Sequence, residues 1–458
     1  MSTIHSKRAA RFVADSEKTS WHDATFWSVR EKRDKMAHEL PEWEDLREHA
    51  SEIKMHTLTH LADYLEMFSN QLESRGVKVH WAKDAREFNE TVLSILNSHG
   101  VKKMVKSKSM LTEECEMNPY LEQHGIDVVE TDLGERILQL LNQKPSHIVM
   151  PAIHLKREEV GRMFEEKGIS KEIGNYDPTY LTRCARQHLR DQFMQAGAGM
   201  TGCNFGVAAT GDCVVCTNEG NADMTTSMPK LHIVAMGIEK LVPDYKSLAV
   251  FQRLLCRCGT GQPTTAFTSH FRQARPGAEM HVVLVDNGRS DMLADEDHWQ
   301  TLKCMRCGAC MNTCPVYRRS GGYSYTYFIP GPVGVNLGML LDPKKYSDNV
   351  SACTLCLSCD NVCPSKVGPG SQIYVWRQTL EKIGKADPLK KGMSAGMEFL
   401  FNRPALYTTA LRLAPIVNYV PECCTHLGNI NAWGIGHAMP EFAKKSFHEL
   451  WKEGKVEE

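Results

Sequence analysis

The stretch Cys304-Met305-Arg306-Cys307-Gly308-Ala309-Cys310-Met311-Asn312-Thr313-Cys314-Pro315 returns with the same spacing as Cys353-Thr354-Leu355-Cys356-Leu357-Ser358-Cys359-Asp360-Asn361-Val362-Cys363-Pro364. Each run has the pattern C-x2-C-x2-C-x3-C-P, which is typical of chains that bind [4Fe–4S] clusters. Three closely spaced thiolates hold one face of the cubane, and the proline after the fourth cysteine turns the chain away. In such paired runs the fourth thiolate binds the other cluster.

The expected ligand sets are therefore crossed between the two runs. They are Cys304, Cys307, Cys310 and Cys363 for the first cluster, and Cys353, Cys356, Cys359 and Cys314 for the second. A cluster bound by four cysteines leaves no iron open to a substrate, so the two runs predict electron transfer. Arg306 and Asp360 lie inside the runs and are expected to tune the clusters, to contact a partner or simply to face solvent.

Zinc and disulfide bonds are the alternatives for so many cysteines. Structural zinc usually takes two separated pairs around one tetrahedral ion, whereas each run here has a tight triple and a fourth cysteine. A disulfide framework suits a short secreted chain, and this chain has 458 residues. The spacing therefore favours two [4Fe–4S] clusters over both alternatives.

Composition and charge narrow the class of protein. The length of 458 residues predicts two or three domains, and the net charge of −1 gives no general attraction to nucleic acid or to an anionic membrane. The 17 cysteines indicate a reducing compartment. Residues 1–15 lack the apolar core of a secretory signal, and the apolar stretch 405–420 is too short to span a bilayer. We expect a cytoplasmic protein and leave open a peripheral contact with the inner face of a membrane.

Hydrophobic periodicity divides the chain into a helical region (1–75), an α/β domain (76–291), a mainly helical cluster-binding domain (298–385) and a helical tail (386–458). Strands that alternate with helices predict a parallel sheet with crossover helices. The expected strands are 77–82, 101–105, 126–131, 147–151, 204–209, 212–217, 231–236 and 280–285. The expected helices are 42–74, 84–98, one that ends at residue 141, 156–167, 178–196 and 371–383. Turns are expected at Gly197, Gly199, Gly202, Gly211 and Gly220.

Four residues outside the cysteine runs form a candidate ligand site. Lys106 and Lys108 follow a predicted strand and flank Ser107, so ammonium and hydroxyl groups are available to a phosphate or a carboxylate. Backbone amides near Gly202 add donors. Glu219 lies in a glycine-containing turn, where a nucleophilic role and an ordinary turn role are both open. The alternative for the whole set is a solvated loop.

The remaining cysteines and histidines are expected to be structural. Cys213 and Cys216 have C-x2-C spacing, but on a strand residues three apart face opposite sides, so shared metal binding is awkward. His147 and His154 have no third ligand nearby in the sequence. The aromatic stretch 323–328 is expected to cover the clusters, with docking of a partner or a quinone as the alternative. No G-x-G-x-x-G motif follows the first strand, so a flavin or nicotinamide is expected on a partner.

Several short motifs together resemble the lactate utilisation protein B family, the iron–sulfur subunit of a bacterial L-lactate-oxidising system. The resemblance covers roughly residues 30–385 and includes both cysteine runs. The other stretches are Lys106-Ser107-Lys108-Ser109-Met110, Glu130-Thr131-Asp132-Leu133-Gly134-Glu135, Pro151-Ala152-Ile153-His154, Thr201-Gly202-Cys203-Asn204-Phe205, Thr217-Asn218-Glu219-Gly220-Asn221, Met236-Gly237-Ile238-Glu239-Lys240 and Asp286-Asn287-Gly288-Arg289-Ser290.

This resemblance implies more than the spacing does. It implies an α/β lactate-utilisation domain, similar to the sugar-phosphate isomerase and CoA-transferase group, followed by a helical two-cluster ferredoxin domain. It implies a non-catalytic redox subunit that works with a cysteine-rich subunit and with a second subunit carrying the same α/β domain. Lactate would become pyruvate, and electrons would leave for the respiratory chain. Cys423 and Cys424 are adjacent, as in the cysteine-rich subunit, but no cysteine follows them, so that module is not expected here.

A second hypothesis belongs to another class of protein. The α/β domain would be an isomerase- or transferase-like enzyme or a ligand sensor, and its clusters would be structural or regulatory. Substitution of Lys106, Lys108 or Glu219 separates the hypotheses, because loss of lactate oxidation with intact clusters would favour the second.

Overall fold

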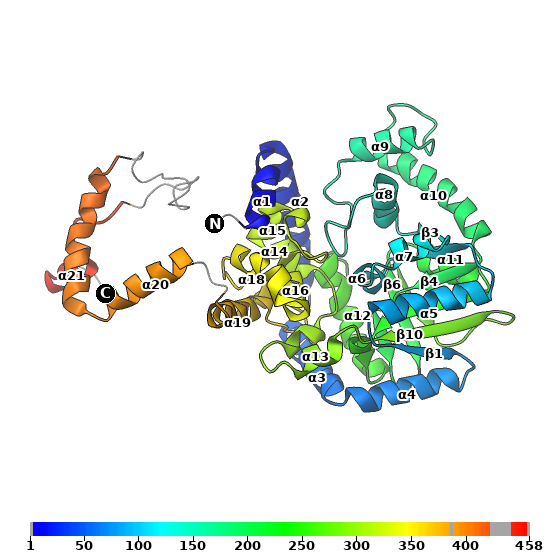
Figure 1. The fold of residues 1–458 in the computed structure, drawn as a ribbon. Coiled ribbons are helices and arrows are strands. Elements are labelled where there is room, and N and C mark those ends of the chain that lie inside the picture. The colour runs from blue at the N-terminus through cyan, green and yellow to red at the C-terminus, as the bar shows by residue number, and fades with distance from the viewer. Residues whose placement is uncertain (1–2, 385–387, 422–440, 456–458) are drawn as a thin grey trace. The chain divides into compact units, whose positions relative to one another are not determined.

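The protein, seen here as a computed structural model, is described over residues 3–384, 388–421 and 441–455 (Figure 1). The chain forms two compact units, of which one extends to Leu380 and the other begins at Glu381. The second unit contains short helices, as the sequence predicts for the tail. They are α20 (Pro388–Phe401), α21 (Pro404–Leu413), η5 (Ala414–Tyr419) and α23 (Phe447–Lys452). Cys423 and Cys424 lie outside the described residues.

The α/β region of the first unit is built on a six-stranded sheet. Its strands are β1 (Lys78–Ala82), β2 (Lys103–Lys106), β3 (Asp127–Glu130), β4 (Ala198–Thr201), β7 (Leu231–Gly237) and β10 (Glu279–Val285). The order is β1-β10-β7-β4-β2-β3, and all neighbouring strands are parallel, which confirms the predicted parallel sheet. Both faces are covered, so β7 and β10 are continuous buried runs rather than alternating ones.

Helices pack on both faces of this sheet. The helices of this region are α4 (Leu61–Glu73), α5 (Ala85–Ser98), α6 (Met110–Glu114), α7 (Met117–Gln123), α8 (Leu133–Leu141), α9 (Arg157–Glu166), α10 (Pro178–Gln195), α11 (Asn221–Ser227), η1 (Ile238–Lys240), α12 (Tyr245–Gly259) and α13 (Arg289–Ala294). Successive residues of one strand point to opposite faces of the sheet. Val283 packs with α5, α6 and α7, whereas Val282 and Leu284 pack with α4.

Two predictions about this region are wrong. The segment that begins at His147 is not a strand, because its imidazole Nδ1 accepts the backbone N–H groups of Val149 (3.1 Å) and Met150 (3.0 Å) and bends the chain. Gly199 is not in a turn but in β4, inside the sheet. A glycine is required there because the carbonyl oxygen of Thr225 lies against the position of a β-carbon.

A smaller mixed sheet has the order β8-β5-β6-β9. Its strands are β5 (Phe205–Val207), β6 (Asp212–Thr217), β8 (Leu241–Val242) and β9 (Phe267–Phe271). β5 and β6 are antiparallel, as are β6 and β9, whereas β5 and β8 are parallel. β9 is not predicted from the sequence because this largely exposed edge strand has no apolar run.

The N-terminal helices pack on the cysteine-rich region. They are α1 (Ile4–Val13), α2 (Ser16–His38) and α3 (Trp43–Thr59), followed by α4, so the predicted helix 42–74 is divided at His60. α2 contacts α14 and α15, and α3 contacts η2 and α12. The elements after the sheet are η2 (Trp299–Lys303), α14 (Ala309–Thr313), α15 (Pro315–Ser320), η3 (Gly322–Ser324), α16 (Gly331–Leu341), α17 (Pro343–Tyr346), η4 (Ser347–Ala352), α18 (Ser358–Val362) and α19 (Pro369–Lys382). Among the described helices, none combines the length and apolar character needed to cross a membrane.

The aromatic stretch belongs to the core of this region. Tyr325 and Tyr327 are buried in one apolar cluster that also includes the partly buried Cys310 and Cys314. Tyr323 is instead exposed, and its hydroxyl donates to the carbonyl oxygen of Lys144 (2.6 Å). Tyr325 lies near Cys310, Cys314 and Cys353, and the covering role of the stretch stays a prediction.

Candidate functional site

The two cysteine runs have the same backbone shape. In each run the residues on either side of the second cysteine have left-handed backbone conformations. They are Arg306 (φ 62°) and Gly308 (φ 80°) in the first run, and Leu355 (φ 55°) and Leu357 (φ 57°) in the second. Such conformations are uncommon for residues other than glycine. The repeat in sequence is therefore also a repeat in three dimensions.

Backbone N–H groups point at the first and last sulfur of each run. The donors are Arg306 to Cys304 (3.4 Å), Tyr317 to Cys314 (3.5 Å), Leu355 to Cys353 (3.3 Å) and Val367 to Cys363 (3.3 Å). Donation to sulfur favours the thiolate, which is the form that binds a metal. Hydrogen bonds to sulfur also help to set the reduction potential of a cluster.

The last cysteine of the second run lies with the first run. Cys363 lines a small cavity together with Cys304, Cys307 and Cys310. Val362, the preceding residue, belongs to the same apolar cluster as Cys307. These four thiols are the set that the sequence assigns to the first cluster.

The last cysteine of the first run likewise lies near the second run. The hydroxyl groups of Thr313 and Ser358 hydrogen-bond at 2.5 Å, and these residues precede the fourth cysteine of the first run and the third cysteine of the second. Burial raises the pKa of the Cys314 thiol to about 11, and the nearby Cys353 and Cys356 add to this effect. Cys314 therefore lies among the cysteines of the second run.

Each set of four thiols fits a [4Fe–4S] cluster by the chemistry of its donors, because a cubane takes four thiolates. The N-terminal helices fix the crossing segment. Arg47 Nε donates to the carbonyl oxygen of Cys363 (3.0 Å), and Arg33 Nη2 donates to that of Val362 (3.2 Å). The assignment of individual ligands stays a prediction.

The two sets differ in charge at equivalent positions. Arg306 stands where the second run has Leu355, and Asp360 stands where the first run has Met311. The Arg306 Nη1 atom is buried without a hydrogen-bond partner. Burial would lower the pKa of Arg306, but Cys304, Glu239 and Glu114 together outweigh it and raise the pKa, so the guanidinium stays charged. The first run therefore has a buried cation at a position where the second run has leucine, whereas beside the second set Arg377 donates to the carbonyl oxygen of Cys353.

Asp360 has a different role. Its carboxylate accepts the N–H groups of Gly370 (2.6 Å) and Ser371 (3.0 Å) at the start of α19. This side chain thus fixes a helix next to the second set and adds a negative charge there. Exposure differs as well, because Cys356 is exposed whereas Cys307 is 8 % exposed.

A cavity of about 360 Å³ opens at the carboxyl ends of the central strands. Lys108, Gly202 and Glu219 line it, and Arg306 and Cys307 of the first run form part of its wall. Ligands of parallel α/β sheets bind at this edge, and the volume suits a small molecule. The structure thus brings three of the four predicted ligand-site residues together beside the first set of thiols.

Lys106 does not line this cavity. Its ammonium group is buried 2.7 Å from Glu130, 3.2 Å from Glu113 and 2.9 Å from the hydroxyl of Thr112. Burial alone would lower the pKa of Lys106, but the two carboxylates outweigh it and raise the pKa. This cation is already paired inside the protein and is not available to an external anion.

Glu219 and Lys108 give the cavity titratable groups. Glu219 Oε2 accepts the N–H of Leu133 at 3.3 Å. Burial and the nearby carboxylate of Asp132 raise the pKa of Glu219 to about 7. Lys108 Nζ donates to the carbonyl oxygen of Val149 at 2.9 Å. The cavity therefore combines a fixed amine with a carboxyl group that changes charge near neutral pH.

The cavity is also lined by three cysteines that were expected to be structural: Cys203, Cys216 and Cys256. They come from three different elements, so no spacing in the sequence connects them. Cys213 lies on the same strand as Cys216 but packs in another core cluster, which confirms that the two face opposite sides.

Two family models match the chain. One is the LUD domain, over residues 65–290, and the other is the 4Fe-4S dicluster domain, over residues 300–367. The second match contains both cysteine runs. The two-part architecture expected from the sequence, an α/β domain followed by a cluster-binding region, is thereby confirmed.

Curated relatives match over nearly the whole chain. Proteins named lactate utilization protein B from Bacillus cytotoxicus and Oceanobacillus iheyensis are 40% and 39% identical, covering 92% and 93% of this chain and 91% of each relative. An uncharacterized electron transport protein of Escherichia coli is 37% identical over 93% of this chain and 91% of its own length. A solved structure of a DUF162 family protein from Deinococcus radiodurans is 12% identical, covers 49% of this chain and 98% of its own, and has a TM-score of 0.28.

Proposed function

Because the chain belongs to the lactate utilization protein B family, we propose that it is the iron–sulfur electron-transfer subunit of a complex that oxidises L-lactate to pyruvate. The observation that carries the proposal is the interleaving of the two cysteine runs, which gives two sets of four thiols. When bound, two [4Fe–4S] clusters would accept and release single electrons on the way to the respiratory chain. The name of the Escherichia coli relative agrees with this role.

Wild-type protein purified without oxygen is expected to contain about eight irons and about eight acid-labile sulfides per chain. Two complete sets of cysteine ligands are the reason. Iron and sulfide assays together with zinc analysis measure this directly. Stoichiometric zinc without sulfide would contradict the proposal.

The replacement Arg306→Leu is expected to lower the reduction potential of one cluster and leave the other unchanged. A fixed cation stabilises the more negative reduced state, and a difference of about 1–2 kcal/mol corresponds to roughly 40–90 mV for one electron. Leucine is the natural choice because Leu355 occupies the equivalent left-handed position of the second run. A redox titration followed by electron paramagnetic resonance separates the two centres.

The matched control for this variant is Arg162→Leu, which removes an exposed guanidinium from α9. Both proteins should keep the wild-type iron content. Equal shifts of both centres, or the same shift in the control, would contradict the charge difference between the two sets.

We further propose that the second set is where a redox partner approaches. Cys356 is exposed, and the adjacent Leu357 has 43% of its surface accessible. The family resemblance supports a cysteine-rich subunit and a second LUD-domain subunit as partners. The hydride acceptor for lactate would lie on a partner, and the assembly would work in the cytoplasm at the inner face of the membrane.

A second candidate function concerns the cavity. We propose that Lys108, Glu219 and the amides near Gly202 bind a small anion, so that the α/β domain has a ligand-binding role of its own. The observation in favour is that a cavity of small-molecule size meets the wall formed by Arg306 and Cys307. A ligand bound there would be next to the first set of thiols.

The variants Lys108→Met and Glu219→Gln test this second function. Each is expected to reduce lactate oxidation by the assembled complex at least about tenfold, because a charged hydrogen bond to a ligand contributes about 1.5–3 kcal/mol. Iron content should stay at the wild-type value. Lys144→Met, which removes an exposed lysine, is the control. Wild-type activity in both cavity variants would leave the domain a purely structural role.

A further inference from the structure

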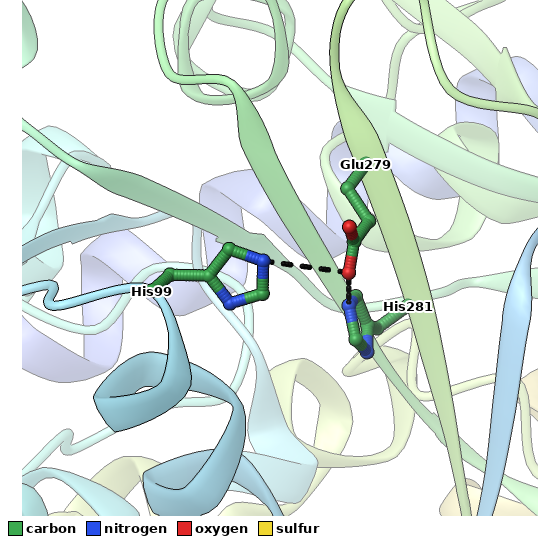
Figure 2. Close-up of side chains that lie close together, drawn as sticks. All are labelled: His99, Glu279 and His281. Atoms are coloured by element: carbon green, nitrogen blue, oxygen red, sulfur yellow. Dashed lines mark hydrogen bonds and ion pairs between the residues drawn. The ribbon is translucent and has the colours of Figure 1, made fainter.

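A cluster of histidines lies at the edge of the six-stranded sheet opposite the cavity, where the parallel strands begin. Glu279 and His281 belong to β10, and His99 follows α5 (Figure 2). In Figure 2 both imidazole rings turn a nitrogen toward the Glu279 carboxylate. The three ligand atoms lie within 4.8 Å of one another.

The distances suit a small cation. Glu279 Oε1 is 2.6 Å from His281 Nε2 and 3.4 Å from His99 Nε2. Ligands about 2.0–2.1 Å from a tetrahedral ion are about 3.3–3.4 Å apart. Of the three separations, that between His99 and Glu279 already has this value, that between His281 and Glu279 needs to lengthen by less than about 1 Å, and the two imidazole nitrogens lie within 4.8 Å of each other.

The outer nitrogen of each ring is held by the fold. His99 Nδ1 is 2.8 Å from the carbonyl oxygen of Ile95, which can only accept, so Nδ1 carries the proton. In the neutral ring, Nε2 then presents a lone pair to the carboxylate. A metal ion between Nε2 and the carboxylate would satisfy both groups, as would a proton on Nε2, and zinc titration distinguishes the two.

His281 has an equivalent support. Its Nδ1 lies 2.9 Å from His80 Nε2, and the two rings are stacked with centroids 5.1 Å apart. In the tautomer with the proton on Nδ1, His281 donates to His80 and offers Nε2 as a ligand. A second hydrogen bond of this kind is usual for histidines that bind metals.

We propose that His99, Glu279 and His281 form a binding site for a divalent cation of the zinc class, with His80 as the positioning residue. Two imidazoles and one carboxylate are a ligand set that zinc accepts, and three protein ligands leave one position for water. The cation would join the turn after α5 to β10. The site lies at the opposite edge from the thiols and does not depend on the proposed electron transfer.

Lys78 is the internal competitor for this site. Its Nζ lies 2.5 Å from the same Glu279 oxygen. The lysine side chain is 56% exposed, so the ammonium can move into solvent when a metal binds. Removal of this charge by Lys78→Met is therefore expected to tighten zinc binding several-fold.

The test is zinc titration by calorimetry on the full-length, cluster-loaded protein. Wild type should bind one equivalent that His99→Ala and His281→Ala both lose and that the control His124→Ala, an exposed histidine, retains. Zinc bound by free thiols is common to all variants and cancels in the comparison. His80→Ala should weaken the site about 10- to 100-fold.

X-ray absorption at the zinc edge identifies the ligands. The equivalent lost in His281→Ala should have nitrogen and oxygen neighbours, without sulfur. Equal zinc stoichiometry in wild type, His99→Ala and His281→Ala would overturn the proposal. So would zinc binding that appears only after Lys78→Met, because lysine would then be the resident cation.

Discussion

Replacing Cys363 with alanine is expected to remove the cluster of the first cysteine run, although Cys363 belongs to the second run. Cys363 lines the cavity of Cys304, Cys307 and Cys310, so its loss leaves that set with three thiols. Iron and sulfide should each fall from about eight to about four per chain. The centre that survives should be the one whose potential the Arg306→Leu replacement leaves unchanged, because Arg306 belongs to the other set.

The converse variant is a second test of the crossed ligand sets. Cys314→Ala should remove the other centre and leave the one whose potential the Arg306→Leu replacement lowers. The control is Cys184→Ala, which removes a half-buried thiol of α10. A surviving centre of the opposite identity in each variant would mean that every run binds its own cluster without crossing.

A large loss of stability is expected from Lys106→Met. The variant leaves Glu130, which is 3% exposed, without its cation. Breaking a buried ion pair in this way costs about 3–5 kcal/mol. The measurement is urea unfolding followed by circular dichroism under anaerobic conditions, with variant and wild type compared at equal cluster content.

The defect of this variant should depend on pH. Burial already raises the pKa of Glu130 above its ordinary value, and without the Lys106 ammonium the hydrogen bond from Asn118 is left to oppose this rise. A carboxyl group whose pKa is higher in the folded than in the unfolded state gives stability at low pH that is lost as the pH rises. The gap between variant and wild type should therefore be smallest in acid and grow toward pH 8.

Lys103→Met is the matched control on the same strand. Lys103 Nζ lies 3.2 Å from Asp127, whose side chain is 58% exposed. An exposed pair of this kind contributes at most about 1 kcal/mol. Equal losses in the two variants would show that the burial of Lys106 is not what makes it important.

Local patterns in the sequence are enough to predict most of the helices and strands. β6 has the predicted bounds 212–217, because a continuous apolar run indicates a strand wherever it lies. Gly199 is misplaced because a glycine inside a strand looks like a turn until its neighbour Thr225 is known. The bend at His147 is missed because a side chain, and not the backbone pattern, produces it.

In the candidate ligand site, too, the sequence predicts some features and only the fold decides the others. Lys106 and Lys108 are two residues apart, and their sequence context is nearly equal. Lys106 is the last residue of β2 and points into a pair of carboxylates, whereas Lys108 lies beyond the strand, in the segment before α6, and lines the cavity. Cys203, Cys216 and Cys256 reach the same cavity from separate elements, so only the fold relates them.

The sequence by itself determined the chemistry of the cysteine runs, because ligands for a cubane must be closely spaced and that spacing is written along the chain. It also determined the parallel sheet, because strands buried on both faces must be apolar throughout. Only the tertiary structure decided which residues meet across the chain: Cys307 with the α/β cavity, and His99 with Glu279 and His281. Such contacts join residues that are distant in sequence, and their positions depend on how all of the intervening elements pack.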